Sequence, residues 1–115
     1  MNEPTLKIIF FKSAAGTEQV REWLRGLTAL ERKTIGEDMK TVQYGWPLGM
    51  PLVRKMKKDV WEVRVTLENK IARILFTVEG QKMILLHGFV KKSPATPATD
   101  LETAMNRLKK LRGES

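Results

Sequence analysis

Two arginines near the middle of the chain, Arg64 and Arg73, have the residue type and the spacing of a phosphate-binding pair. Each lies in a run of alternating apolar and polar residues, and the runs flank Glu68-Asn69, a pattern that predicts a β-hairpin. If those two residues form the loop, Arg64 lies directly opposite Arg73, whereas a three-residue loop would change the pairing. Like charges placed opposite each other destabilise a sheet. We therefore expect an anion beside the pair, because guanidinium groups bind phosphate oxygens in a bidentate manner.

The positive charge of the chain is concentrated around this hairpin. The net charge is +8, and the segment 52–92 contains ten basic and four acidic residues, which gives +6 of that total. Such a field favours a polyanionic partner, meaning nucleic acid, an acidic protein or an anionic membrane surface, although a solvated charged face is the alternative interpretation. The other basic residues of the segment that we expect near the partner are Arg54, Lys55, Lys57, Lys58, Lys91 and Lys92.

Several kinds of chemistry are excluded by composition. The chain has no cysteine, so thiol catalysis, disulfides and thiolate metal sites are impossible. Its single histidine, His87, has no acids at metal-ligand spacing, and there is no glycine-rich phosphate loop, so we expect no metal. If the turn at 79–82 keeps the simplest parity, His87 shares a face with Ile74 and is a packing residue. If the turn slips by one residue, His87 lies beside Arg73 and is a candidate acid or base.

The elements that must position these residues follow from hydrophobic periodicity and capping signals. Thr28-Ala-Leu-Glu31 and Thr99-Asp-Leu-Glu102 each have the spacing of a capping box at the start of a helix. The expected strands are 6–11, 52–56, 60–67, 70–78 and 83–90, and the expected helices are 17–26, 28–44 and 99–112. The order β-α-α-β-β-β-β-α predicts an α+β fold: a mainly antiparallel, twisted sheet of about five strands packed on an N-terminal helical hairpin, with a C-terminal helix.

The length of the chain and its longest apolar runs limit the number of domains and the location of the protein. Its 115 residues suffice for one domain, 1–115, and are few for two. The N-terminus lacks the basic start and apolar core of a signal peptide, and no apolar run approaches the ~20 residues of a membrane span. We therefore expect a soluble, cytoplasmic protein that is not associated with a membrane.

Four ordered fragments resemble a known group of proteins. They are Trp61-Glu-Val-Arg64, Ala72-Arg-Ile-Leu-Phe76, Ile84-Leu-Leu-His-Gly-Phe-Val-Lys-Lys92, and Pro97 followed by a helix with Ala104 and Arg107. The set resembles the RelE/ParE toxin superfamily, and above all its HigB-like, phage-derived branch of type II toxin–antitoxin systems. The helix with Val20-Arg-Glu-Trp-Leu24 is similar as well, so the resemblance covers most of the chain.

The resemblance implies a RelE-like toxin that cleaves mRNA in the ribosomal A site. A cognate antitoxin, a helix-turn-helix DNA-binding protein, would hold it inactive in a hetero-oligomer. In such enzymes the nucleophile is the 2′-hydroxyl of the RNA itself, so the resemblance implies no metal and no other cofactor. It assigns Arg64, Arg73, Lys91 and Lys92 to the scissile phosphate, and Arg54, Lys55 and Lys57, with Lys58 beside them, to the grip on RNA.

The sequence departs from the family pattern at one position. Some relatives place a tyrosine near the C-terminus as a candidate general base, and no tyrosine follows Tyr44 here. A lysine among cationic neighbours, or His87, is then the candidate base. Two other functions stay open: a ParE-like, non-enzymatic toxin that inhibits DNA gyrase, and a catalytically inactive module that binds RNA or the antitoxin.

Overall fold

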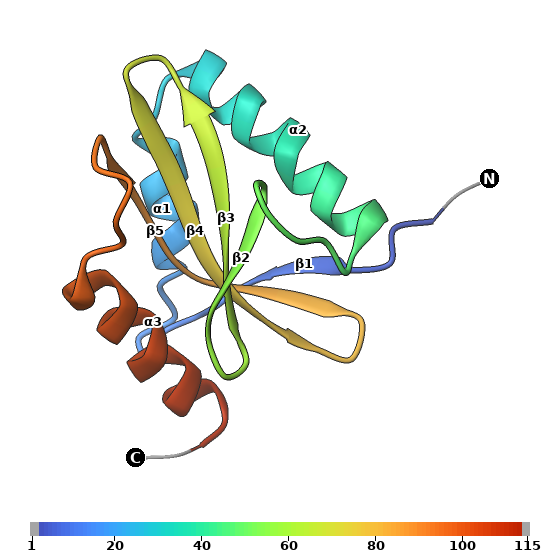
Figure 1. Cartoon of the computed structure of the whole chain (residues 1–115). Coiled ribbons are helices and arrows are strands. Elements are labelled where there is room, and N and C mark those ends of the chain that lie inside the picture. The colour runs from blue at the N-terminus through green and yellow to red at the C-terminus, as the bar shows by residue number, and fades with distance from the viewer. Residues whose placement is uncertain (1–2, 114–115) are drawn as a thin grey trace.

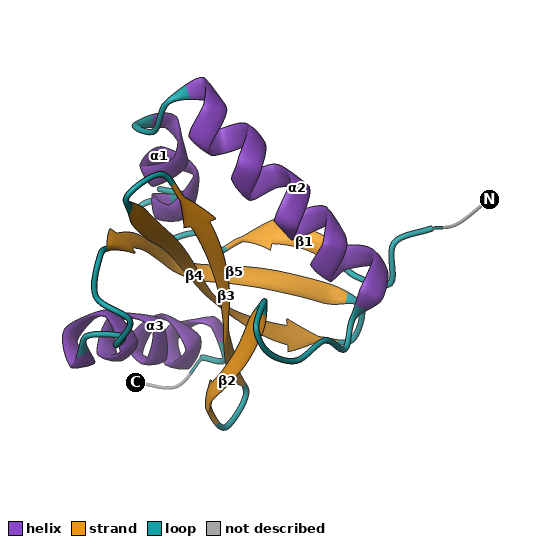
Figure 2. Ribbon diagram, turned by 45° about the horizontal axis from the view of Figure 1, so that its top comes forward, coloured by secondary structure: helices purple, strands orange, loops and turns teal. Residues whose placement is uncertain are grey.

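The computed structural model describes residues 3–113 and places three helices on the two faces of one five-stranded sheet (Figures 1 and 2). The strands are β1 (Lys7–Phe10), β2 (Val53–Lys57), β3 (Val60–Leu67), β4 (Lys70–Glu79) and β5 (Lys82–Lys91). The helices are α1 (Gln19–Arg25), α2 (Ala29–Gly45) and α3 (Ala98–Leu111). The strand order is β1-β5-β4-β3-β2, with β1 parallel to β5 and the other pairs antiparallel. The predicted α+β fold and order of elements are confirmed, in a sheet that is mixed.

Helices α1 and α2 cover the face of the sheet that carries the larger apolar core (Figure 2). Because side chains alternate along a strand, one set of hairpin residues lies on this face, and all of them are 0% exposed: Val63, Val65, Ala72, Ile74 and Phe76. The rings of Trp46 and Trp61 meet edge to face with centroids 5.2 Å apart, and both pack on Phe76. Both tryptophans are therefore packing residues of this core.

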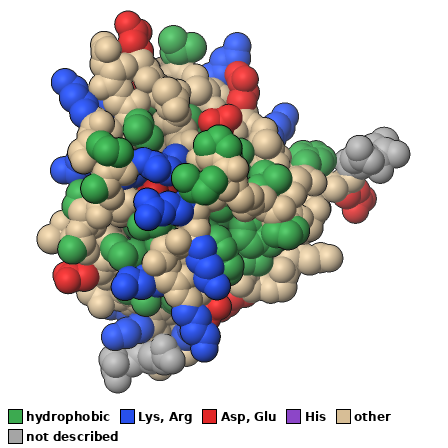
Figure 3. All heavy atoms as spheres, in the orientation of Figure 1, with side chains coloured by type: hydrophobic (Ala, Val, Ile, Leu, Met, Phe, Trp, Pro, Cys, Tyr) green, Lys and Arg blue, Asp and Glu red, His purple; other side chains and the backbone are tan. Residues whose placement is uncertain are grey.

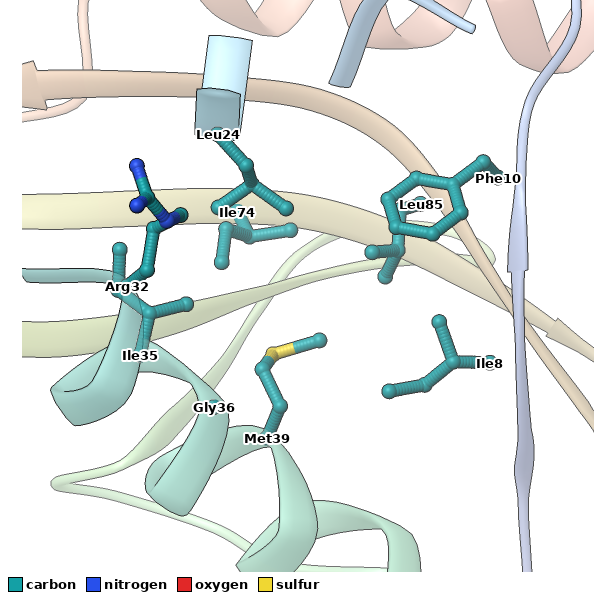
Figure 4. Close-up of a pocket in the computed structure, with 9 residues that line it drawn as sticks. All are labelled: Ile8, Phe10, Leu24, Arg32, Ile35, Gly36, Met39, Ile74 and Leu85. Carbon is teal, nitrogen blue, oxygen red and sulfur yellow. The ribbon is translucent and has the colours of Figure 1, made fainter. Parts of the chain in front are cut away.

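This core contains a small apolar cavity beneath α2 (Figure 4). Its volume is about 190 Å³, and apart from Arg32 and Gly36 its lining is apolar, as Figure 4 shows for Leu24, Ile74 and Met39. The cavity lies on the opposite face of the sheet from the arginine pair.

None of the helices in the described part of the chain is long and apolar enough to cross a membrane.

Helix α3 covers the other face with a second, smaller core. The helix begins at Ala98, directly after Pro97, and has no side-chain cap. The capping box predicted at Thr99 is therefore wrong, because proline presets the backbone angle of a helix start and α3 begins before that threonine. The box at Thr28 is confirmed: the Thr28 N–H donates to Glu31 at 2.9 Å, and the Glu31 N–H donates to the Thr28 hydroxyl at 3.1 Å.

A β-bulge between β4 and β5 decides which way His87 points. The pairing runs from Glu79 with Lys82 to Phe76 with Leu85, and then continues as Leu75 with His87, so that Leu86 is the extra residue. The shift turns His87 to the face that carries Arg73, and the packing position expected for it beside Ile74 is wrong. The pairing does shift by one residue, as in the alternative that places His87 on the face of Arg73. The shift occurs at the bulge and not in the turn at 79–82.

Gly88 follows the bulge and pairs with Ile74 on the α1 side of the sheet. A Cβ atom at this position would lie only 2.4 Å from Cε3 of Trp23, so the indole ring packs directly on the strand backbone. Glycine is thus required here by the close approach of α1.

Candidate anion-binding site

The predicted register of the central hairpin is confirmed. Arg64 pairs with Arg73, and Leu67 pairs with Lys70 across a two-residue loop in which Asn69 has a φ of 62°. Asparagine tolerates this left-handed conformation better than most residues. The two arginines differ in exposure: the Arg64 side chain is 18% exposed, whereas Arg73 is 0% exposed.

A buried carboxylate lies beside the arginine pair. Glu62 is 0% exposed, and its Oε1 lies 3.6 Å from Nε of Arg64. Its Oε2 accepts a hydrogen bond of 2.5 Å from the Thr96 hydroxyl, and that hydroxyl accepts one of 3.1 Å from Nη1 of Arg73. In the free protein, Glu62 therefore supplies negative charge that we had expected only from a ligand.

The segment after β5 takes up much of the remaining hydrogen-bonding capacity of the two arginines. Nη2 of Arg73 donates to the carbonyl of Ser93, and Nη2 of Arg64 donates to the carbonyl of Pro94 at 2.7 Å. Burial lowers the pKa of Arg73 from its ordinary value, while the charge of Glu62 acts in the opposite direction. Arginine stays protonated in proteins, so a positive charge is held under this segment. Arg73 thus fixes the path of the chain that leaves β5.

Arg64 keeps donors that a ligand can reach. Its Nη1 has no hydrogen-bond partner within residues 3–113, and the side chain lines an open groove. Lys91 pairs with Ile71 and so lies two residues further along the same face, and both Lys91 and Lys92 are exposed. Figure 3 shows Lys and Arg side chains gathered beside hydrophobic ones on the face turned to the viewer. The arrangement offers one guanidinium and two ammonium groups to an anion.

The other predicted RNA contacts are divided between regions. Arg54 pairs with Glu62 and lies exposed on the face of the arginine pair. Lys57 and Lys58 lie exposed at the turn between β2 and β3, at the far end of that strand pair from Arg64. Lys55 belongs to the opposite face, where its ammonium lies 5.8 Å from the centroid of Trp61. The structure therefore brings Arg54 near the pair and does not bring Lys55 there.

His87 is held by two charged residues of α3. Its Nε2 lies 2.7 Å from Oδ1 of Asp100, and its Nδ1 lies 3.4 Å from Nη1 of Arg107. The same Arg107 nitrogen donates to the carbonyl of Leu86 at 2.8 Å, which satisfies the backbone at the bulge. Burial lowers the pKa of Arg107. Both ring nitrogens are engaged, so His87 ties α3 to β5 in this conformation.

Four residues of this region were not found from the sequence as parts of the site: Glu62, Thr96, Asp100 and Arg107. Glu62 carried a usable signal, because it lies two residues before Arg64 on the same strand and must share its face. Arg107 belongs to one of the four fragments that carry the family resemblance, although no role was assigned to it there. Thr96 and Asp100 carried no signal, since their contacts depend on the path of the chain after β5. No group of three or more His, Asp or Glu side chains in the described part of the chain is placed to hold a metal ion.

Comparison with known proteins gives one family. A family model described as phage derived protein Gp49-like (DUF891) matches residues 22–109. No curated protein matches the sequence.

Proposed function

Because the chain belongs to the phage-derived Gp49-like family, a family of RelE/HigB-type toxins of toxin–antitoxin systems, we propose that this toxin cleaves mRNA at the ribosome. Membership of the family implies a cognate antitoxin. One observation supports the ribonuclease in particular: Arg64 and Arg73 are cross-strand neighbours on the face that also carries Lys91. A cluster of fixed cations suits a reaction in which negative charge develops on phosphate.

In the proposed reaction, the 2′-oxygen of the RNA attacks the adjacent phosphorus. A bond forms between phosphorus and the 2′-oxygen, and the bond from phosphorus to the 5′-oxygen of the next nucleotide breaks, leaving a 2′,3′-cyclic phosphate and a 5′-hydroxyl. The attacking hydroxyl loses a proton to a base, and the leaving oxygen gains one from an acid. No metal takes part in any of these steps.

The residues have separate roles in this proposal. Nη1 of Arg64 binds a non-bridging phosphate oxygen, and Lys91 and Lys92 stabilise the charge of the transition state. Arg73 acts from beneath the site, where it contributes charge and holds the Ser93 carbonyl. Arg54, with the more distant Lys57 and Lys58, binds the RNA backbone along the sheet.

The proton acceptor is assigned to a lysine. Lys91 and Lys92 are the candidates, because both are exposed and Lys91 lies on the face of the arginine pair. His87 is the alternative, but the contacts with Asp100 and Arg107 occupy both of its ring nitrogens. A histidine base would have to release one of them first.

Expression in a growing cell, followed by primer extension on mRNA, tests the proposal. We expect growth arrest and codon-positioned cuts with the wild type, and neither with Arg64→Ala, because loss of one oxyanion donor lowers a rate by about 10²–10³. Arg64→Lys should recover little activity, since lysine lacks the bidentate fork. Arg25→Ala is the matched control: Arg25 is an exposed arginine on α1 that forms an ion pair with Glu22.

Two outcomes would contradict the proposal. Undiminished cutting by folded Arg64→Ala would remove Arg64 from the site, and thermal melts of each variant show whether it is folded. Growth arrest without RNA cuts, together with inhibition of DNA gyrase in vitro, would instead identify a ParE-like toxin.

A further inference from the structure

The apolar cavity on the helical side of the sheet lies where α1, α2 and β1 come together (Figure 4). Its volume is about 190 Å³, and its floor is formed by Ile74 of β4 and Leu85 of β5, which are 0% and 2% exposed. Its walls are apolar side chains of the other three elements: Ile8, Phe10, Leu24, Ile35 and Met39. Protein interiors are close-packed and seldom leave a space of this size, so the cavity is a candidate binding site.

Gly36 of α2 leaves the entrance of this cavity open. It lines the cavity and is itself exposed, so the cavity reaches solvent beside it. Glycine is less favourable than alanine in the interior of a helix, and neither common reason for a glycine applies here. Its φ is not in the left-handed region, and a Cβ atom on it would meet no heavy atom within 4 Å, whereas a Cβ on Gly88 would lie 2.4 Å from Trp23. A side chain at position 36 would therefore occupy free space at the entrance.

Arg32 lies one helical turn before Gly36 and lines the same entrance. Its Nη1 donates to the carbonyl of Leu27 and lies 3.5 Å from that of Arg25, which fixes the orientation of the guanidinium. Its Nε and Nη2 have no hydrogen-bond partner within residues 3–113. These two nitrogens form the side of the guanidinium that binds both oxygens of a carboxylate. The entrance thus offers a paired donor to an anion, directly above an apolar interior.

The size and the lining of the cavity define the ligand. An apolar cavity of roughly 150 Å³ accepts benzene, so this one has room for one ring or a short alkyl chain and little more. Apart from Arg32 and Gly36 the lining is apolar, so a polar group on the body of a ligand would be left without a hydrogen bond. The polar end of the ligand must then lie at the entrance, where the free donors of Arg32 favour a carboxylate.

We propose that this cavity binds a small apolar monocarboxylate, a molecule of the size of phenylacetate. Its apolar body lies over Ile74 and Leu85, and its carboxylate binds Nε and Nη2 of Arg32. The site lies on the opposite face of the sheet from the arginine pair, and the inference does not depend on the proposed ribonuclease activity. A ligand that binds only the folded state stabilises it, so occupation of the cavity makes the stability of this protein depend on the ligand.

Titration of the purified full-length chain with phenylacetate, followed by NMR of its methyl groups, tests the inference. We expect saturable shifts of the methyl signals of Ile35, Ile74 and Leu85, which line the cavity. Phenylacetamide has the same shape without the charge and should bind about three- to fivefold more weakly. Acetate has the charge without the apolar body and should leave these signals unchanged, because burial of apolar surface supplies most of the affinity.

Gly36→Leu tests the place of the ligand. The new side chain fills the entrance and should abolish the methyl shifts, and the variant is expected to fold because leucine favours helix and has free space at this position. Thr41→Leu is the matched control: Thr41 is an exposed residue of the same helix that does not line the cavity, so phenylacetate should bind this variant as it binds the wild type.

Arg32→Gln tests the charge and keeps the inference testable if Gly36→Leu does not fold. It should weaken phenylacetate binding about three- to fivefold and leave phenylacetamide binding unchanged. Lys33→Gln removes the same charge from the next residue, which is exposed and does not line the cavity, and it should leave the binding of both compounds unchanged.

The inference is overturned if phenylacetate at about 10 mM, ten times a Kd of about 1 mM, leaves the cavity methyl signals unshifted. Equal affinity for phenylacetate and phenylacetamide would overturn the carboxylate as the recognised group. Undiminished binding by folded Gly36→Leu would place the ligand outside this cavity. None of these results bears on RNA cleavage, because each measurement reports binding alone.

Discussion

Arg73 and Ile74 are adjacent on β4, and both are 0% exposed, yet they lie in opposite surroundings. Ile74 packs in the apolar core beneath α1 and α2. Arg73 lies on the other face, where its neighbours are the Thr96 hydroxyl, the Ser93 carbonyl and the charge of Glu62. A buried ion pair is seldom more stabilising than apolar side chains of the same volume. The comparison therefore indicates that the polar cluster of Arg73, Glu62 and Thr96 serves to position the segment after β5, whereas the apolar core beneath α1 and α2 supplies stability.

The largest effect on the free energy of unfolding is expected from Glu62→Ala, which removes the carboxylate from the cluster of Arg73, Glu62 and Thr96. Removing one member of a buried ionic network leaves the other charge uncompensated and costs about 3–5 kcal/mol. Urea unfolding measures this loss. Glu79→Ala is the matched control, because Glu79 is an exposed glutamate of β4 whose ion pair with Arg112, at 3.6 Å, should contribute at most about 1 kcal/mol.

A double variant, Glu62→Met with Arg73→Met, replaces the two charged residues of this cluster with apolar ones. If stability returns to within about 1–2 kcal/mol of the wild type while RNA cleavage is lost, the network is retained for function. Full cleavage by this variant would contradict the positioning role of Arg73.

A smaller effect is expected on the apolar face from Gly88→Ala. The new Cβ would lie 2.4 Å from the Trp23 ring, so α1 must shift, and overpacking of this kind costs about 1–3 kcal/mol. Trp23→Leu in the same chain should relieve the clash, and a double-mutant cycle by urea unfolding would report the coupling. Equal destabilisation by Gly88→Ala with and without Trp23 would show that the contact is not the cause.

His87→Ala should cost about 1–2 kcal/mol, because it removes the tie between α3 and β5 and leaves Asp100 without its partner. Cleavage, measured on ribosomes together with the unfolding transition, should keep its rate and its pH dependence. A loss of about 10²-fold or more in a folded variant would instead identify His87 as the general base.

The local part of this site could be predicted from sequence, and the long-range part could not. The pairing of Arg64 with Arg73 follows from alternation and from a two-residue loop, both of which are contained within a few residues. The predicted orientation of His87 was wrong because it depends on the bulge at Leu86. The carbonyl of Leu86 accepts a hydrogen bond from Arg107, 21 residues later. That Glu62 shares the face of Arg64 follows from alternation, but its hydrogen bond with Thr96 joins residues 34 positions apart and does not follow from any local pattern.

The smallest effect concerns Glu31, a half-buried counterpart of the fully buried Glu62. A hydrogen bond from Lys70, at 2.5 Å, and then the backbone N–H of Thr28 hold the pKa of Glu31 below its ordinary value of 4.5. A carboxyl whose pKa is lower in the folded state than in the unfolded state stabilises the fold above the unfolded pKa, and this contribution is lost as the pH falls through the folded pKa.

We therefore expect Lys70→Ala to raise the pKa of Glu31, observed by NMR titration of its carboxyl carbon. The variant should also reduce the difference in the free energy of unfolding between neutral pH and pH below 4.5. Lys82→Ala, an exposed lysine on β5 without an ion pair in the described chain, should leave the Glu31 titration unchanged. An unshifted Glu31 in Lys70→Ala would show that the capping hydrogen bond at Thr28 alone sets its pKa.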